Sequence, residues 1–150
     1  MKAVIQRVAV ARVTVDGLIV GAIDQGLLVF LGITHTDSEA ECDWLCEKIA
    51  HLRIFSDTQD KMNLSVVDIA GQVLVVSQFT LYANAMNGRR PDFIQAARPE
   101  VAMPLYEKFV AKMEKILNRK VATGIFGAKM SIELINDGPV TILIDTDKNI

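Results

Sequence analysis

The first third of the chain consists of short apolar runs separated by turn residues. Residues 3–15 alternate loosely between apolar and polar side chains, as a half-buried strand does, and Asp16–Gly17 is a hairpin signal. Residues 18–23 resume the apolar pattern, and after a second turn Leu27–Ile33 is apolar throughout, which is typical of a strand buried on both faces. The pattern predicts that residues 1–34 are entirely β.

Two later segments carry apolar residues at helical spacing. We predict the first helix from about Ser38 to His51, because Thr36, Asp37 and Ser38 offer N-caps and acidic residues follow in the first turn. Its expected apolar face consists of Trp44, Leu45, Ile49 and Leu52.

The second helix is predicted within residues 99–118, and its start depends on two prolines. Pro99 suits a first helical turn, whereas Pro104 would remove a hydrogen bond from a helix interior. We therefore expect the helix to begin in earnest only near Pro104. The apolar stripe, which we interpret as core, is formed by Leu105, Phe109, Met113, Ile116 and Leu117.

The remaining segments predict short strands and loops around these helices. Arg53–Phe55 is expected to be a short strand, residues 56–63 a polar loop, and Gln72–Gln78 the central strand. Residues 83–91 predict a flexible loop, and Val121–Gly124 leads out of the second helix.

Two final strands, Met130–Ile135 and Thr141–Ile144, complete the order β-β-β-α-β-β-α-β-β. This order predicts an α/β (α+β) fold, in which a mixed, largely antiparallel β-sheet curls toward a barrel and two main helices pack outside it. Closure is expected because open sheet edges promote aggregation. No linker, repeat or low-complexity tract divides the chain, so residues 1–150 predict a single domain.

Composition restricts the class of protein further. Hydrophobic residues make up 51% of the chain, which is enough for one well-filled core. The apolar runs are too short to span a membrane, and the opening strand does not resemble a signal peptide, so we expect a cytoplasmic protein with no membrane partner. Cys42 and Cys46 share one helix face and are interpreted as buried free thiols. With His35 and His51 they form no recognisable metal motif, so neither a metal nor a cofactor is predicted.

The net charge of −2 does not indicate a basic face that wraps a nucleic-acid duplex, and no DNA partner is expected. A protein of this charge that binds a nucleic acid would contact only a few phosphates near the end of that molecule. The basic residues that could make such contacts are Arg89, Arg90, Arg98 and Lys129. The alternative interpretation is that they are ordinary solvated surface residues, and we adopt this interpretation for Arg98.

Two segments place chemically useful groups at predicted strand ends. Ser77–Leu81 puts two hydroxyls and an amide where the apolar run Val73–Val76 emerges, and strand ends are where sites are often built. Asn136–Val140 interrupts the last two predicted strands. This second segment has two interpretations, because its residues all favour turns, yet Gly138 and Pro139 at a sheet edge or bulge could present bare carbonyl groups to a small substrate.

Together these two segments resemble the D-aminoacyl-tRNA deacylase family, the enzymes that remove D-amino acids from tRNA. The resemblance covers nearly the whole chain. The other matching segments are Ile5–Val8, Gly26–Val29, Arg53–Phe55, Lys61–Leu64, Gly88–Pro91 and Thr123–Ala128.

The resemblance implies a function, a substrate and a quaternary structure. The expected reaction is hydrolysis of the ester at the 3′ end of D-aminoacyl-tRNA, and of glycyl-tRNA mischarged on tRNA-Ala, as chiral proofreading during translation. The enzyme is expected to be a homodimer in which the loop bearing Gly138 and Pro139 reaches the partner's site. The alternatives are a non-catalytic module that binds the tRNA end and a structural homodimerisation module.

The resemblance also implies roles for particular residues. A cis peptide bond between Gly138 and Pro139 would align their carbonyl groups as a wall that excludes L-amino acids. Arg7 would steady this loop by hydrogen bonds to main-chain oxygens, although a strand-surface ion pair is its alternative interpretation. The predicted substrate-binding residues are Gly138, Pro139, Arg7 and Asn136, with Phe126 and Met130 in an adenosine pocket that plain core packing would equally explain.

The chemistry is expected to use main chain rather than a conventional triad, because no Gly-x-Ser-x-Gly elbow is present and neither histidine lies in a site-like segment. Two mechanisms stay open. The Thr80 hydroxyl could be a nucleophile, or the N–H groups of Phe79 and Thr80 could stabilise the oxyanion while the 2′-hydroxyl of the terminal adenosine helps to activate water. We adopt the second mechanism, because it explains the missing base. The predicted catalytic residues are Ser77, Gln78, Phe79 and Thr80.

Overall fold

The computed structural model describes residues 1–147, and its main sheet is built around the first strand. β1 (Lys2–Val15) pairs antiparallel along one edge with β2 (Leu18–Ile23) and β3 (Gly26–Gly32). Its other edge pairs antiparallel with the long final strand β8 (Ser131–Asp145). The prediction that the first part of the chain is β is therefore confirmed.

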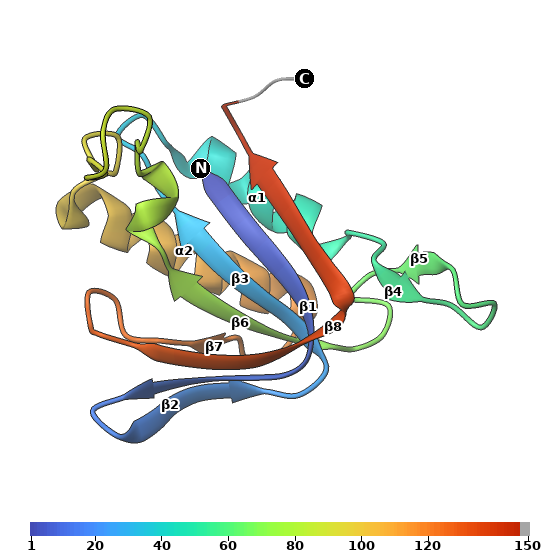
Figure 1. Cartoon of the computed structure of the whole chain (residues 1–150). Helices are drawn as coiled ribbons and strands as arrows, with labels where there is room; N and C mark the ends of the chain where they lie inside the picture. Colours follow the sequence, from blue (N-terminus) through green and yellow to red (C-terminus); the bar gives the residue numbers. More distant parts are fainter. Residues whose placement is uncertain (148–150) are drawn as a thin grey trace.

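Parallel strands extend the sheet beyond β3. β6 (Gln72–Ser77) pairs with β3, and β7 (Ala122–Thr123) pairs with β6, both in parallel. The sheet curls until β7 approaches β2, so closely that a Cβ atom at Gly21 would lie 2.3 Å from the carbonyl oxygen of Thr123. The predicted mixed sheet that curls toward a barrel is confirmed (Figure 1).

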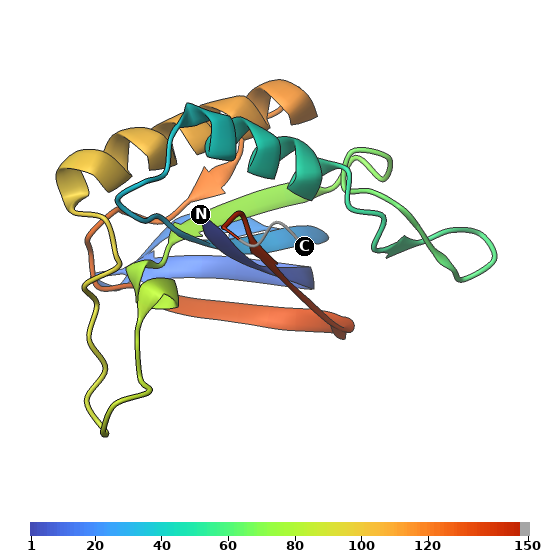
Figure 2. The same cartoon turned by 90° about the horizontal axis from the view of Figure 1, so that it is seen from above.

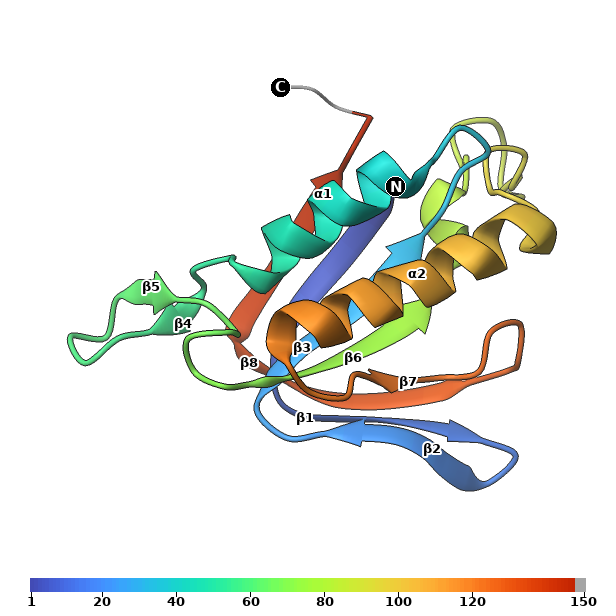
Figure 3. The ribbon, with the colours of Figure 1, turned by 180° about the vertical axis from the view of Figure 1, so that it is seen from behind.

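The two helices, α1 (Glu39–Ala50) and α2 (Pro99–Leu117), lie side by side on one face of the sheet (Figure 2, Figure 3). The larger hydrophobic core fills the space between the helices and the sheet, and includes Ile5, Leu27, Leu45 and Phe109. A smaller cluster lies on the opposite face, within the curl of the sheet, and includes Val8, Val13, Leu28 and Leu74. None of the described helices has the length and apolar character that a membrane crossing requires.

Local chemistry explains where α1 begins. Ser38 is the N-cap and forms a capping box with Glu41. The Ser38 hydroxyl oxygen accepts from the backbone N–H of Glu41, and the Glu41 carboxylate accepts from the backbone N–H and the hydroxyl of Ser38. The predicted bounds are confirmed to within one residue at each end. Trp44, however, is 51% exposed and is not part of the buried face, so that part of the prediction is wrong.

α2 begins at Pro99 and continues through Pro104, so the prediction that it begins only near Pro104 is wrong. The carbonyl oxygen of Arg98 accepts hydrogen bonds from the N–H groups of Val101 (3.0 Å) and Ala102 (2.9 Å), which satisfies the first turn. Pro104 therefore costs one hydrogen bond, and the buried face of a long amphipathic helix outweighs that loss.

Three elements differ from the sequence-based prediction. A small hairpin of β4 (Phe55–Ser56) and β5 (Met62–Leu64) replaces the strand and loop expected at residues 53–63. The segment after α2 contains the short strand β7. The two final strands are one strand, β8, which continues through the Gly-Pro pair with irregular register against β1.

Candidate active site

The carboxyl ends of the parallel strands β3, β6 and β7 meet at one edge of the sheet. Beyond Ser77 the chain turns into the 3₁₀ helix η1 (Phe79–Tyr82), and the N–H of Gln78 donates to the carbonyl oxygen of Leu31 (2.8 Å). The loop that carries Phe126 leaves β7 at the same end of the molecule (Figure 1). The structure thus brings the predicted catalytic segment and Phe126 to a common edge.

Main-chain donors are exposed at this turn. Phe79 and Thr80 are both exposed, and within residues 1–147 neither of their N–H groups has a hydrogen-bond acceptor. The side-chain amide of Gln78 donates to the Thr80 hydroxyl oxygen. No carboxylate, imidazole or amine in this part of the chain is hydrogen-bonded to that hydroxyl. The turn therefore offers two free donors and a hydroxyl without a base.

A neighbouring aromatic ring that the sequence-based reasoning missed holds this turn in place. The rings of Phe79 and Phe93 pack edge to face, with centroids 5.2 Å apart. Phe93 belongs to a segment tied to the sheet edge by the hydrogen bond from the Thr34 hydroxyl to the carbonyl oxygen of Gln95 (2.6 Å). No periodicity in the loop sequence signals this contact, because it depends on a chain reversal between the two rings.

The second predicted segment is a bulge within β8, and the turn interpretation is wrong. The Gly138–Pro139 peptide bond is cis, as the resemblance implies. Gly138 has φ of 131°, a conformation that strongly favours glycine, and an added Cβ would lie 2.8 Å from Nη2 of Arg7. Gly138 and Pro139 are exposed, whereas Val140 is buried and anchors the chain after them.

Arg7 connects this bulge to the base of the β4–β5 hairpin. Its Nε donates to the carbonyl oxygen of Asp137 (3.0 Å), and its Nη1 donates to the carbonyl oxygen of Ile54 (2.7 Å). The predicted main-chain hydrogen bonds are present. The alternative is also partly right, because Nε lies 3.3 Å from the Asp137 carboxylate.

The side chain of Asn136 spans the bulge. Its Oδ1 accepts from the N–H of Val140 (3.1 Å), and its Nδ2 donates to the Thr141 hydroxyl (3.2 Å). Through these contacts Asn136 supports the bulge. Its contact with the substrate stays a prediction.

The two predicted segments lie far apart within one chain. The Gly138–Pro139 bulge lies opposite Arg7, whereas Ser77 aligns through Leu31 with Ala3. About four residues of β1 and three strand spacings therefore separate them, roughly 13 Å along the strands and about 14 Å across the sheet. A single copy of the chain does not assemble them into one site.

Phe126 and Met130 belong to different hydrophobic clusters. Phe126 packs against the helix-side core with its ring 5.8 Å from that of Tyr106, and it borders a groove of about 350 Å³ along α2. Met130 packs into the smaller cluster, and its sulfur would lie 2.4 Å from a Cβ at Gly124. These contacts agree with core packing, and the adenosine pocket stays a prediction.

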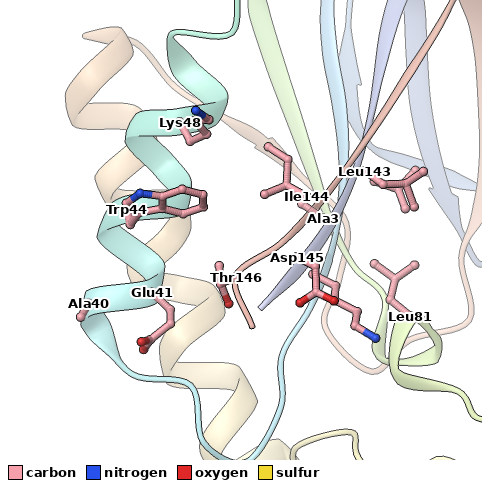
Figure 4. Close-up of a pocket in the computed structure, with 12 residues that line it drawn as sticks. Ala3, Ala40, Glu41, Trp44, Lys48, Leu81, Leu143, Ile144, Asp145 and Thr146 are labelled. Carbon is pink, nitrogen blue, oxygen red and sulfur yellow. The ribbon is translucent and has the colours of Figure 1, made fainter. Parts of the chain in front are cut away.

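A larger cavity of about 830 Å³ lies between α1 and the adjoining ends of β1 and β8 (Figure 4). Trp44 and Lys48 face it from α1, and Asp145 and Thr146 line it from the end of β8. None of the predicted site residues lines this cavity, and only Leu81 borders it from the η1 turn. Because its described lining pairs no nucleophile with a base, we do not assign the reaction to it.

Titratable groups near the sheet edge are dominated by burial. Burial raises the pKa of the Tyr82 hydroxyl, which has no hydrogen-bond partner within residues 1–147. Burial also raises the pKa of Tyr106 to about 12, and its hydroxyl donates to the carbonyl oxygen of Val75 (2.9 Å).

Cys42 and Cys46 are buried free thiols, as predicted, and both face α2. Residues 1–147 contain no group of three metal-ligating side chains that could hold an ion.

The fold places the chain in a class of α+β proteins with a curled mixed sheet and two outer helices. A solved structure named "c-Myc DNA Unwinding Element Binding Protein" matches with a TM-score of 0.91 and 40% identity over 97% of this chain and 99% of that one. A second, named "Structural Analysis of a probable eukaryotic D-amino acid tRNA deacylase", matches with a TM-score of 0.85 and 15% identity over 95% of this chain and 97% of the other, and shows the fold alone.

The family follows from sequence. The sequence model of the D-Tyr-tRNA(Tyr) deacylase family matches residues 4–145, and the chain belongs to this family. A protein of Cytophaga hutchinsonii named D-aminoacyl-tRNA deacylase is 60% identical over 97% of both chains. A protein of Thermus aquaticus with the same name is 55% identical over 99% of this chain and 97% of its own. The resemblance drawn from the two segments is confirmed.

Proposed function

We propose that the chain hydrolyses the ester bond of D-aminoacyl-tRNA and releases the free D-amino acid and tRNA. The observation that carries this proposal is the family match over residues 4–145, which includes both Ser77–Leu81 and Asn136–Val140. We treat residues 1–150 as one deacylase domain that acts in chiral proofreading in the cytoplasm.

The unpaired N–H groups of Phe79 and Thr80 support an oxyanion site at the η1 turn. Such donors stabilise the negative charge that develops when water attacks an ester carbonyl, and one donor contributes about 3 kcal/mol in known enzymes. An aminoacyl ester is already reactive, so orientation together with charge stabilisation suffices. The 2′-hydroxyl of the terminal adenosine supplies the hydrogen bond that activates the water.

The environment of Thr80 favours this mechanism over a threonine nucleophile. A nucleophilic hydroxyl needs a base that accepts its proton. Thr80 instead accepts a hydrogen bond from the Gln78 amide, which draws electron density from the hydroxyl oxygen. Gln78 thus orients the turn, and Ser77 ends the strand that carries it.

A second copy of the chain supplies the other half of the site. The bulge and the η1 turn lie too far apart within one chain to contact one amino acid. Both are exposed and both project main-chain groups, so they can meet across a homodimer. Arg7 and Asn136 hold the bulge so that Gly138 and Pro139 reach the partner's turn.

This arrangement sorts the two hands of an amino acid by shape. Main-chain carbonyls of Gly138 and Pro139 face the α-carbon and bind the amino group, so an L side chain collides with backbone while a D side chain projects outward. The wall contacts no side chain, which gives broad tolerance of D-amino acids. Glycine has no side chain to collide, and we expect glycyl-tRNA mischarged on tRNA-Ala to be cleaved as well.

The test is hydrolysis by the purified protein of D-tyrosyl-tRNA, L-tyrosyl-tRNA and glycyl-tRNA. We expect the D and glycyl esters to decay many-fold faster than without enzyme, and the L ester to decay at the uncatalysed rate. Decay of the D and L esters at the uncatalysed rate would leave a module that only binds the tRNA end or only dimerises. The same preparation is also titrated with duplex DNA, because the name of one similar solved structure says that the protein in it binds DNA. We expect no binding of duplex DNA by this chain.

A further inference from the structure

We propose that Arg89 and Arg90, at the tip of the loop after η1, bind phosphates of the RNA strand whose 3′ end carries the ester. This inference rests on the function proposed above and names how the RNA part of the substrate is held. The loop, defined here as residues 84–92, begins two residues after η1 ends and projects from the body of the molecule (Figure 2).

The base of this loop is fixed to the η1 turn. Asn84 and Asp92 exchange two backbone hydrogen bonds of 2.9 and 3.0 Å, which close the loop into a narrow stem. Gly88 turns the tip with φ of 76°. Phe93, directly after the stem, packs against Phe79, so the loop is anchored beside the proposed oxyanion donors.

The charges at this end of the molecule are unbalanced. Arg89 and Arg90 are exposed, and within residues 1–147 neither lies within 4.0 Å of a carboxylate. The one acid of the stem, Asp92, accepts the N–H of Ile94 (3.3 Å). Several cations elsewhere do pair with acids, namely Lys108, Lys112, Lys120 and Arg12. Lys48 and Lys115 on the helices have no ion pair among the described residues, but they are not adjacent in sequence as Arg89 and Arg90 are.

The positive charge at this loop contrasts with the charge of the whole chain. The chain has a net charge of −2, so a general attraction to nucleic acid does not explain binding. Two adjacent guanidinium groups with free donors match phosphate oxygens, which arginine binds in bidentate geometry. The occupant that the charge favours is therefore a phosphodiester strand.

The loop has the length to reach past the terminal nucleotide. Because residues 86–90 bend, the four residues on each side of the tip span less than the roughly 13 Å of an extended chain, so the tip reaches at most about four nucleotides at roughly 3.4 Å per nucleotide of stacked strand. With the ester held at Phe79 and Thr80, the phosphates of the nucleotides that precede the 3′-terminal one would lie beside the tip. The loop then increases affinity for the whole tRNA without contacting the reacting atoms.

The experiment compares the double variant Arg89→Ala/Arg90→Ala with wild-type protein and with a control. The control is Lys115→Ala/Lys120→Ala, which removes the same charge near the far end of α2. Binding of uncharged tRNA is titrated with salt, and kcat/KM is measured for D-tyrosyl-tRNA and for the D-tyrosyl ester of adenosine. A third variant, Arg89→Lys/Arg90→Lys, keeps the charge.

Loss of two single-strand phosphate contacts should reduce the salt slope by about 1.4, so that from about 50 to 200 mM salt wild-type affinity falls about sevenfold more than that of the alanine variant. We expect kcat/KM to fall on tRNA and not on the adenosine ester, the lysine variant to retain most of the wild-type slope, and the control to match wild type. Equal salt slopes for wild type and the alanine variant would overturn the inference, as would equal losses on both esters. If wild type hydrolysed neither ester, the proposed function would fail, and the binding slopes would still decide the role of the loop.

Discussion

Thr80 distinguishes the two mechanisms at the scale of one residue. Thr80→Ala removes the hydroxyl but keeps the N–H group, so we predict that it retains kcat within about tenfold of wild type, well short of the loss expected for a missing nucleophile. The measurement is single-turnover hydrolysis of D-tyrosyl-tRNA. An inactive variant with intact circular dichroism would instead favour the hydroxyl as nucleophile. Gln78→Ala is a matched variant, because it removes the hydrogen bond to that hydroxyl but keeps the hydroxyl itself.

At the scale of elements, a buried hydrogen bond from the Tyr106 hydroxyl to the carbonyl oxygen of Val75 adds to the hydrophobic packing of α2 against the sheet. Tyr106→Phe should lower the free energy of unfolding at pH 7 by about 1 kcal/mol. Tyr82→Phe removes a buried hydroxyl that lacks a partner among the described residues, so it should be neutral or slightly stabilising. Urea unfolding of both variants is the measurement. A larger loss for Tyr82→Phe would contradict this account.

The same tyrosine gives the stability a pH dependence. Burial raises the pKa of Tyr106 to about 12, above its unfolded value, so from about pH 10 upward the unfolded chain loses its proton first. Stability is therefore lost with rising pH, by about 1.4 kcal/mol per unit between pH 10 and 12 from this group. Tyr106→Phe should show a shallower alkaline loss than wild type. Tyr82, whose pKa burial also raises, adds a slope that this variant leaves in place.

The elements also show how far sequence could predict the structure. α1 was predictable because Ser38 and Glu41 form its capping box within one turn. The bulge was not, because Asn136–Val140 has the composition of a turn, and it stays extended through Arg7, which is remote in sequence. The Ser77–Thr80 segment was recognisable as a strand end because it follows an apolar run. The contact between the rings of Phe79 and Phe93 was not predictable, because it depends on a chain reversal between them.

At the scale of the whole molecule, the proposed mechanism requires that two copies of the chain complete each site. Two variants disable opposite halves. Phe79→Pro removes one N–H donor, and Phe79→Ala is its control because it removes the ring but keeps that donor. Gly138→Val places a side chain against Arg7 and Val140 and should displace the bulge. We expect both Phe79→Pro and Gly138→Val to be inactive as homodimers and to retain circular dichroism like wild type.

The most direct measurement is the activity of these two inactive variants after they are unfolded together, mixed in equal amounts and refolded. A mixed dimer has one site with an intact turn from one chain and an intact bulge from the other, so D-tyrosyl-tRNA hydrolysis should return to about one quarter of the wild-type rate. A mixture that stays inactive, although mass spectrometry shows mixed dimers, would contradict a site shared between two chains.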